Sequence, residues 1–171
     1  MRLLSVIIMI VVAGCKQESI QTGETGIEDY LNNNLPGWTL IDTADYARSW
    51  WSFYDKKETH NSITLDFNDD RIADHALLLK KDSSLRLVVL LGSGNKSYTH
   101  FIVDDFQPVY NGKVKDIQYG LAVEPPAQID VLEPEEKSLI LLFNAITLLD
   151  MEDRARIYYW RNNRVNTLYA K

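Results

Sequence analysis

Hydrophobic and polar residues alternate along much of the chain after residue 62, and this is the pattern of half-buried β-strands. Ile63, Leu65 and Phe67 alternate with polar neighbours, and residues 155–159 repeat the pattern near the C-terminus. Because successive side chains of a strand point to opposite faces, the alternation predicts one face on a core and one toward solvent. Further strand candidates are short runs at residues 76–79, 87–91, 98–103 and 113–123.

The last strands are predicted to form a hairpin. Asn162 and Asn163 follow the run at residues 155–159 and precede a second alternating run, and Asn tolerates the left-handed backbone of tight hairpin turns. Residues 139–149, just before the hairpin, are apolar almost throughout. We favour a buried strand there. A helix is the alternative, because the Pro-Glu-Glu of residues 134–136 is typical of a first helical turn.

Helices are predicted only before the strands. Thr25-Gly26-Ile27-Glu28 matches a capping box, in which the Thr25 hydroxyl and the Glu28 carboxylate bond free amides at a helix start, and Pro36-Gly37 ends the element. Three apolar side chains of this helix share one face: Ile27, Tyr30 and Leu31. A second short helix near Thr43 would bring together the rings of Tyr46, Trp50 and Tyr54.

This order predicts an α+β fold, with short N-terminal helices followed by a mainly antiparallel β-sheet, a meander of about six to eight strands. The chain has 171 residues, of which 46% are hydrophobic and 25% charged, as expected for one folded domain. It carries 24 acidic and 18 basic residues, a net charge of −6. An acidic surface repels phosphate backbones, so nucleic acid is excluded as an expected partner.

The first fourteen residues predict a secretory signal. Met1-Arg2 is a basic start, and residues 3–13 are apolar except for Ser5. Eleven helical residues cover only about half of the ~30 Å hydrocarbon layer, so the run is too short to span a bilayer permanently. A basic start, a short apolar run and then small residues are the parts of a signal peptide.

Val12-Ala13-Gly14-Cys15 resembles the lipobox of bacterial lipoproteins. The resemblance implies cleavage before Cys15, lipid on that cysteine and acylation, for example by palmitate, of the new N-terminus. In that family, Asp at the position after the cysteine signals retention in the inner membrane. This chain has Lys16 there, which implies attachment to the outer membrane with the domain facing the periplasm. The predicted division is a signal peptide at residues 1–14, a lipidated cysteine with a polar tether at 15–24, and one β-rich globular domain at 25–171.

Two consequences follow for the mature chain. The leader contains one charged residue, Arg2, so removing it changes the net charge from −6 to −7. Cys15 is the single cysteine of the sequence, so no intrachain disulfide is expected and the core and sheet must stabilise the domain.

The segment from Asp66 to Asp74 is the most suggestive of metal chemistry. Oxygen-bearing side chains stand at relative positions 1, 3, 5 and 9, and position 7 offers a backbone carbonyl, a spacing that suits a weak Ca²⁺ site. The candidate ligands are Asp66, Asn68, Asp70, Ile72 and Asp74. The spacing resembles the D-x-N-G-D-G-x-x-D loops of FG-GAP and VCBS-type repeats.

The segment departs from that pattern at both glycine positions, which hold Asp69 and Arg71, and it occurs once rather than in repeats. A residue with a Cβ is strained by about 1 kcal/mol where such a loop needs glycine. The alternative is a turn in which Asp and Asn side chains bond neighbouring amides without a metal. Together with residues 157–160 (Ile-Tyr-Tyr-Trp), the segment resembles uncharacterised exported proteins of Gram-negative bacteria, which implies a similar fold and no activity.

Candidate catalytic residues are few. His60, His75 and His100 are scattered, and the adjacent carboxylates Asp104-Asp105 are typical of a solvated turn. We therefore expect a membrane-tethered, non-enzymatic binding or interaction module whose partner is an envelope protein, with an inhibitor or immunity-type role as one specific form. The alternative is an envelope-acting hydrolase that uses acidic residues. A cleft with two facing carboxylates would favour the hydrolase, and an exposed apolar patch would favour the binder.

Overall fold

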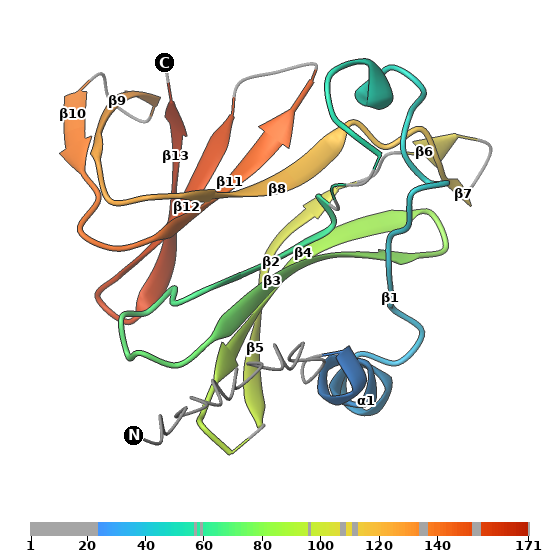
Figure 1. Ribbon diagram of the computed structural model, residues 1–171, viewed down its shortest axis with the longest axis horizontal. Coiled ribbons are helices and arrows are strands. Elements are labelled where there is room, and N and C mark those ends of the chain that lie inside the picture. The colour runs from blue at the N-terminus through green and yellow to red at the C-terminus, as the bar shows by residue number, and fades with distance from the viewer. Residues whose placement is uncertain are drawn as a thin grey trace, which may run out of the picture.

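The computed structural model describes residues 24–56, 58, 60–95, 97–106, 109–110, 113–133, 137–151 and 155–170. It consists of one N-terminal helix followed by two main antiparallel β-sheets (Figure 1), which confirms the predicted fold class. Cys15, the predicted leader, the tether before residue 24 and residues 134–136 lie outside the described residues. The strands are divided between two sheets that pack on each other, where the sequence predicted one meander.

The first sheet has the order β1-β3-β4-β5, and β2 also pairs with β3. Its central strands contain the short apolar runs that the sequence predicted at residues 76–79 and 87–91. Ile63 and Leu65 lie in β2, whereas Phe67 follows that strand and is fully buried. The bounds are Thr39–Leu40 for β1, Ser62–Leu65 for β2, Asp74–Lys81 for β3, Ser84–Gly92 for β4 and Tyr98–Phe106 for β5.

The second sheet has the order β10-β9-β13-β12-β11-β8. Its β12–β13 hairpin turns at Asn162 and Asn163, which have φ angles of 55° and 57° and confirm the predicted left-handed turn. The bounds are Tyr119–Glu124 for β8, Gln128–Glu133 for β9, Lys137–Ile140 for β10, Ala145–Asp150 for β11, Arg156–Arg161 for β12 and Arg164–Ala170 for β13. A two-stranded sheet is formed by β6 (Val109–Tyr110) and β7 (Lys113–Val114).

Two predicted strands are each divided in the structure. Residues 139–149 form the end of β10, a loop and then β11, so the prediction of one buried strand there is wrong; the two strands have different partners, because β10 pairs with β9 whereas β11 pairs with β8 and β12. Residues 113–123 are divided between β7 and β8. Asp116 there has a φ of 55°, and the Ile117 amide donates to the Asp45 carbonyl, which takes the chain out of both strands.

Three apolar clusters hold these layers together. The main cluster lies between the two sheets and includes Leu78, Leu87, Ile146 and Tyr158. The second lies between α1 and the outer face of the first sheet. The third lies on the other face of the second sheet, where the β9–β10 hairpin covers β11, β12 and β13; it contains Val131, Leu141, Ala145, Ile157 and Leu168. Neighbouring residues of β11 therefore pack in two different cores: Ala145 in the third cluster and Ile146 in the main one.

The N-terminal helix α1 spans Glu24–Asn34, so Thr25 lies inside its first turn and its side chain is not among those described. Its apolar residues Ile27, Tyr30 and Leu31 pack on the second cluster, as predicted. The expected second helix near Thr43 is instead one 3₁₀ turn, η1 (Trp50–Ser52), because residue 46 forms a β-bridge with Ile117.

The predicted grouping of three aromatic rings around Trp50 is nevertheless confirmed. The ring centroid of Trp50 lies 5.2 Å from that of Tyr46 and 4.2 Å from that of Tyr54.

Candidate functional site

The end of β10 and the loop that joins it to β11 present apolar side chains on both faces. Leu139 and Leu141 point inward and pack in the third cluster, where Leu141 is 3% exposed. The Leu141 amide donates to the Ala127 carbonyl at 2.8 Å, which fixes the backbone of the loop. Because strand side chains alternate, Ile140 and Leu142 point outward. They are 65% and 70% exposed.

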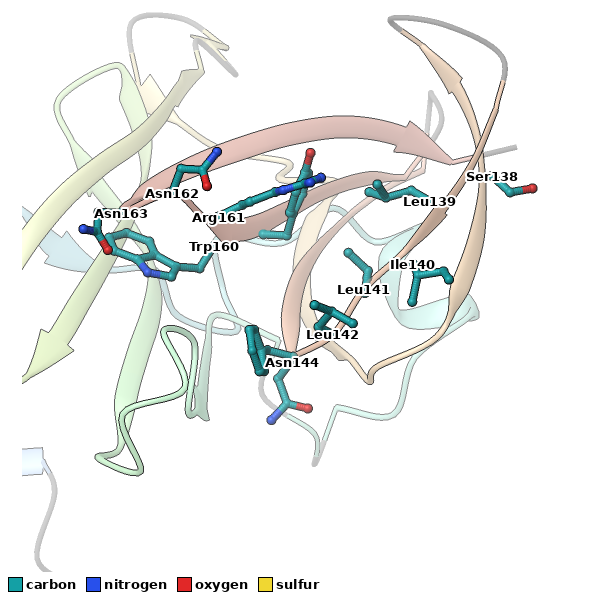
Figure 2. A pocket seen from close by; sticks show the side chains of 12 residues that line it. Ser138, Leu139, Ile140, Leu141, Leu142, Asn144, Trp160, Arg161, Asn162 and Asn163 are labelled. Atoms are coloured by element: carbon teal, nitrogen blue, oxygen red, sulfur yellow. The ribbon is translucent and has the colours of Figure 1, made fainter.

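Phe143 adds a third exposed apolar side chain, at 39% exposure. The loop borders a groove of about 590 Å³ whose other wall is the β12–β13 turn (Figure 2). Figure 2 shows Ile140, Leu141 and Leu142 on one side of this groove, with Trp160 and Asn163 on the other. We refer to Ile140, Leu142 and Phe143, with the β12–β13 turn beside them, as the loop surface.

The charge of the loop surface differs from that of the whole chain. No acidic residue lines the groove, and Arg161 is its one charged lining residue. Arg164, at the other end of the same turn, is also exposed. A nearby carboxylate, that of Asp130, accepts a hydrogen bond from the Ser138 hydroxyl at 2.8 Å. The lining of the groove is therefore apolar with one cationic side chain, and the Asp130 carboxylate lies beside it on Ser138, on a chain with a net charge of −6.

A second groove, of about 540 Å³, lies between α1 and the strands β1 and β2. Apolar side chains such as Leu31, Trp38 and Leu77 line it together with the polar residues Thr64 and His75. The imidazole Nδ1 of His75 is 3.1 Å from the Thr64 hydroxyl, and burial lowers the pKa of His75. His75 is therefore predominantly neutral in the fold at neutral pH.

The candidate Ca²⁺ segment forms a tight turn in which side-chain oxygens accept backbone amide hydrogens. The Asp70 amide donates to Asp66 Oδ1 at 3.1 Å and to Asn68 Oδ1 at 3.2 Å. Asp66 Oδ2 accepts from Arg71, and Asp70 Oδ1 accepts from the amide that follows it by two residues. The structure thus brings together three of the five predicted ligands: Asp66, Asn68 and Asp70.

The two positions that hold glycine in the loops that this segment resembles have a left-handed backbone. The φ angles are 61° at Asp69 and 65° at Arg71. Each L-residue in that region costs about 1–2 kcal/mol, so the amide hydrogen bonds of the turn offset real strain.

Asp74, the last predicted side-chain ligand, has a different surrounding. It is fully buried, and its two oxygens accept 2.8 Å hydrogen bonds from the amides of Phe67 and Gly92. Burial raises the pKa of Asp74, and these two hydrogen bonds oppose the shift. Asp74 therefore ties the turn to the end of β4. Among the described residues, no group of three or more His, Cys, Asp or Glu is placed to hold a metal ion.

Asp104 and Asp105 lie within β5, so the interpretation of this pair as a solvated turn is wrong. A β-bulge explains their different surroundings: Leu87 pairs with Asp104 and Val88 with Ile102, which leaves Val103 as an extra residue. A bulge bends its strand and re-aims the side chains around it. Asp104 meets the second sheet, whereas Asp105 is exposed and pairs with Arg86 at 2.6 Å.

Asp104 links the two sheets. Its Oδ2 accepts a 2.6 Å hydrogen bond from the Tyr158 hydroxyl and a 2.9 Å hydrogen bond from Arg156 Nη1. Arg156 Nη2 also lies 3.5 Å from Asp150. Sequence reasoning missed this network because the chemistry depends on contacts between residues more than fifty positions apart.

The three histidines do not form a catalytic set with these carboxylates. His60 packs against the rings of Trp50 and Tyr54. His75 and His100 both pair with Leu90, on opposite sides of β4. The His100 Nδ1 lies 3.0 Å from the Tyr30 hydroxyl. In the two grooves, Glu28 is the single carboxylate among the lining residues, so neither groove presents two facing carboxylates.

Comparison of the chain with protein-family models, with curated proteins and with solved structures gave no match. The resemblances to lipoproteins and to FG-GAP and VCBS-type loops therefore remain predictions. Within the part of the chain that the structure describes, no helix is long and apolar enough to cross a membrane.

Proposed function

We propose that this chain is a bacterial lipoprotein, held by lipid on Cys15 at the periplasmic face of the outer membrane. Its domain is a non-enzymatic binding module that engages an envelope partner through the loop surface. The observation that carries this proposal is the exposure of Ile140 at the end of β10 and of Leu142 and Phe143 in the loop that follows it. Scattered exposed apolar residues are ordinary, whereas a contiguous group of this kind is typical of an interaction site.

The energetics fit a tethered binder. Full burial of one such side chain contributes about 1.5–3 kcal/mol. Covering the exposed parts of three of them contributes about 4 kcal/mol, which is no more than the cost of bringing two free partners together. An interaction of that strength is useful when the partner is held nearby, and a lipid anchor would supply the high local concentration.

The lipid anchor is tested by metabolic labelling with a fatty acid. We expect the full chain to incorporate the label and Cys15→Ser to lose it, leaving unprocessed precursor or a free soluble form. Unchanged labelling and unchanged membrane fractionation of the variant would contradict the anchor.

Binding through the loop surface is tested by photo-crosslinking in cells that produce the full chain. A photoreactive amino acid is placed at Leu142 and, as a matched control, at Phe53, which is 74% exposed outside the loop surface. We expect a discrete adduct, resolved by mass spectrometry as protein or lipid, from position 142 and not from position 53. The same diffuse adducts from both positions would contradict the proposal.

A further inference from the structure

The packing of the domain does not account for the apolar side chains that point outward from the end of β10 and the loop after it. Leu139 and Leu141 already supply the contacts of this segment with the third cluster. None of Ile140, Leu142 and Phe143 belongs to that cluster, and they are 65%, 70% and 39% exposed. A strand that is apolar on both faces normally has a layer on each face. Because nothing in the described chain supplies that layer over Ile140 and Leu142, their outward face is available to a partner.

The charge around these side chains indicates what that layer is. Arg161 and Arg164 are exposed at the ends of the β12–β13 turn, and no acidic residue lines the groove between this turn and the apolar loop. The whole chain carries six more acidic than basic residues, so its surface in general repels anions. Exposed apolar side chains beside cationic ones match an anionic bilayer, which offers a charged headgroup layer above an apolar interior.

We propose that the loop surface inserts into an anionic lipid bilayer. Ile140, Leu142 and Phe143 enter the boundary between headgroups and acyl chains, and Arg161 and Arg164 pair with lipid phosphates. This inference rests on the proposed binding role of the loop surface and names a lipid surface as its partner. Inward packing of Leu141 and the hydrogen bond of its amide hold the loop in shape, so insertion needs no refolding of the domain.

The test uses the full chain with Cys15→Ser, which removes its single thiol, and Leu142→Cys carrying a polarity-sensitive fluorophore. Phe53→Cys with the same label is the control. The vesicles are phosphatidylcholine with or without phosphatidylglycerol, and a second set contains brominated lipid as a quencher. If the apolar leader inserts into the vesicle, it does so equally in the two labelled variants. A difference in fluorescence between the labels at positions 142 and 53 therefore reports insertion of the loop alone.

We expect a blue shift and quenching for the label at position 142, larger on anionic vesicles, and neither for the label at position 53. Arg161→Gln and Arg164→Gln should each weaken the response about fivefold, because a basic residue near such a surface contributes about 1 kcal/mol. Added salt should weaken it further.

Equal responses of the two labels, or no response at position 142, would overturn the lipid inference. A shift at position 142 that grows with protein concentration in the absence of vesicles would also overturn it and identify a second copy of the chain as the occupant. A discrete protein adduct from position 142 in cells, without insertion into vesicles, would overturn the lipid inference and leave the proposed binding role standing. If neither a discrete adduct from position 142 in cells nor insertion into vesicles is found, both the lipid inference and the proposed binding role are wrong.

Discussion

Removing the carboxylate of Asp104 should destabilise the packing of the two sheets on each other. The Tyr158 hydroxyl and Arg156 both donate to Asp104, at 2.6 and 2.9 Å. Tyr158 is 1% exposed. Breaking a buried charge pair by deleting one partner costs about 3–5 kcal/mol. The Asp104 side chain is 30% exposed, and Arg156 keeps Asp150 at 3.5 Å, so we expect Asp104→Ala to cost about 2–3 kcal/mol.

The network also predicts coupling between its members. Tyr158→Phe removes the hydroxyl together with its need for a partner, so it should cost only about 1–2 kcal/mol. In that background Asp104→Ala leaves no unpaired phenol, so its cost should fall by about 1 kcal/mol. Asp105→Ala is the matched control: its pair with Arg86 lies on an exposed face, and its loss should cost less than about 1 kcal/mol.

Urea unfolding followed by tryptophan fluorescence measures all of these variants, because the chain has four tryptophans. Equal effects of Asp104→Ala and Asp105→Ala would refute the reasoning. So would additivity of Asp104→Ala and Tyr158→Phe within about 0.5 kcal/mol.

The same network predicts a pH dependence. Burial raises the pKa of Tyr158 above its ordinary value of 10.0, and the hydrogen bond to Asp104 adds to the shift. The unfolded chain therefore loses this proton near pH 10 while the folded chain keeps it, so stability is retained below pH 10 and falls above it. One such proton gives a slope of about 1.4 kcal/mol per pH unit. Tyr158→Phe should remove that part of the alkaline slope, and an unchanged slope would contradict the assignment.

Three further predictions concern the rest of the domain. Gly120→Ala should destabilise it by about 1–3 kcal/mol, because the new Cβ would clash with a ring atom of Trp50. Gly26→Ala, in open space on α1, should stabilise it by about 0.5–1 kcal/mol, and equal effects of the two in thermal melts would contradict the packing. Millimolar Ca²⁺ should leave the melting temperature unchanged, because carboxylate oxygens of the Asp66 turn already accept amide hydrogens. A rise of several degrees that Asp70→Ala abolishes would instead show a metal site. Such a site would stabilise the folded domain by about 2.7 kcal/mol at a hundredfold excess of Ca²⁺ over Kd. Residues 25–171 should fold as a soluble monomer insensitive to reducing agent, and a circular dichroism spectrum without β structure would contradict this.

Local patterns predicted the secondary structure where a single element determines it. The alternation in β2 and β12, the Asn162-Asn163 turn and the apolar runs of β3 and β4 all depend on neighbours within about ten residues. The division of the strands between two sheets depends on which faces pack together, and alternation alone does not specify this. Residues 139–149 illustrate the limit: an apolar run interrupted only by Asn144 and Thr147 contains a loop between two strands but no glycine or proline.

The candidate site shows the same limit. The sequence predicted either a metal loop or an Asp- and Asn-rich turn at Asp66, and strain where Asp69 and Arg71 replace glycine, because that geometry is local. It did not predict that Asp74 bonds the Gly92 amide or that Asp104 reaches Tyr158, because both contacts cross between strands. The loop surface was missed because its apolar residues were assigned to a core. The available signal was five consecutive apolar residues, 139–143, which place an apolar side chain on both faces.

The most direct test of the central claim is the reactivity of a cysteine at position 142 in intact envelopes. In the lipidated protein the Cys15 sulfur would carry the lipid, so Leu142→Cys would be the only free thiol. A polar maleimide should label it slowly in envelopes and quickly after extraction in detergent, because position 142 is 70% exposed in the domain alone and covered by its partner in the envelope. Phe53→Cys should react at the same rate in both preparations. Equal rates for position 142 before and after extraction would contradict the account.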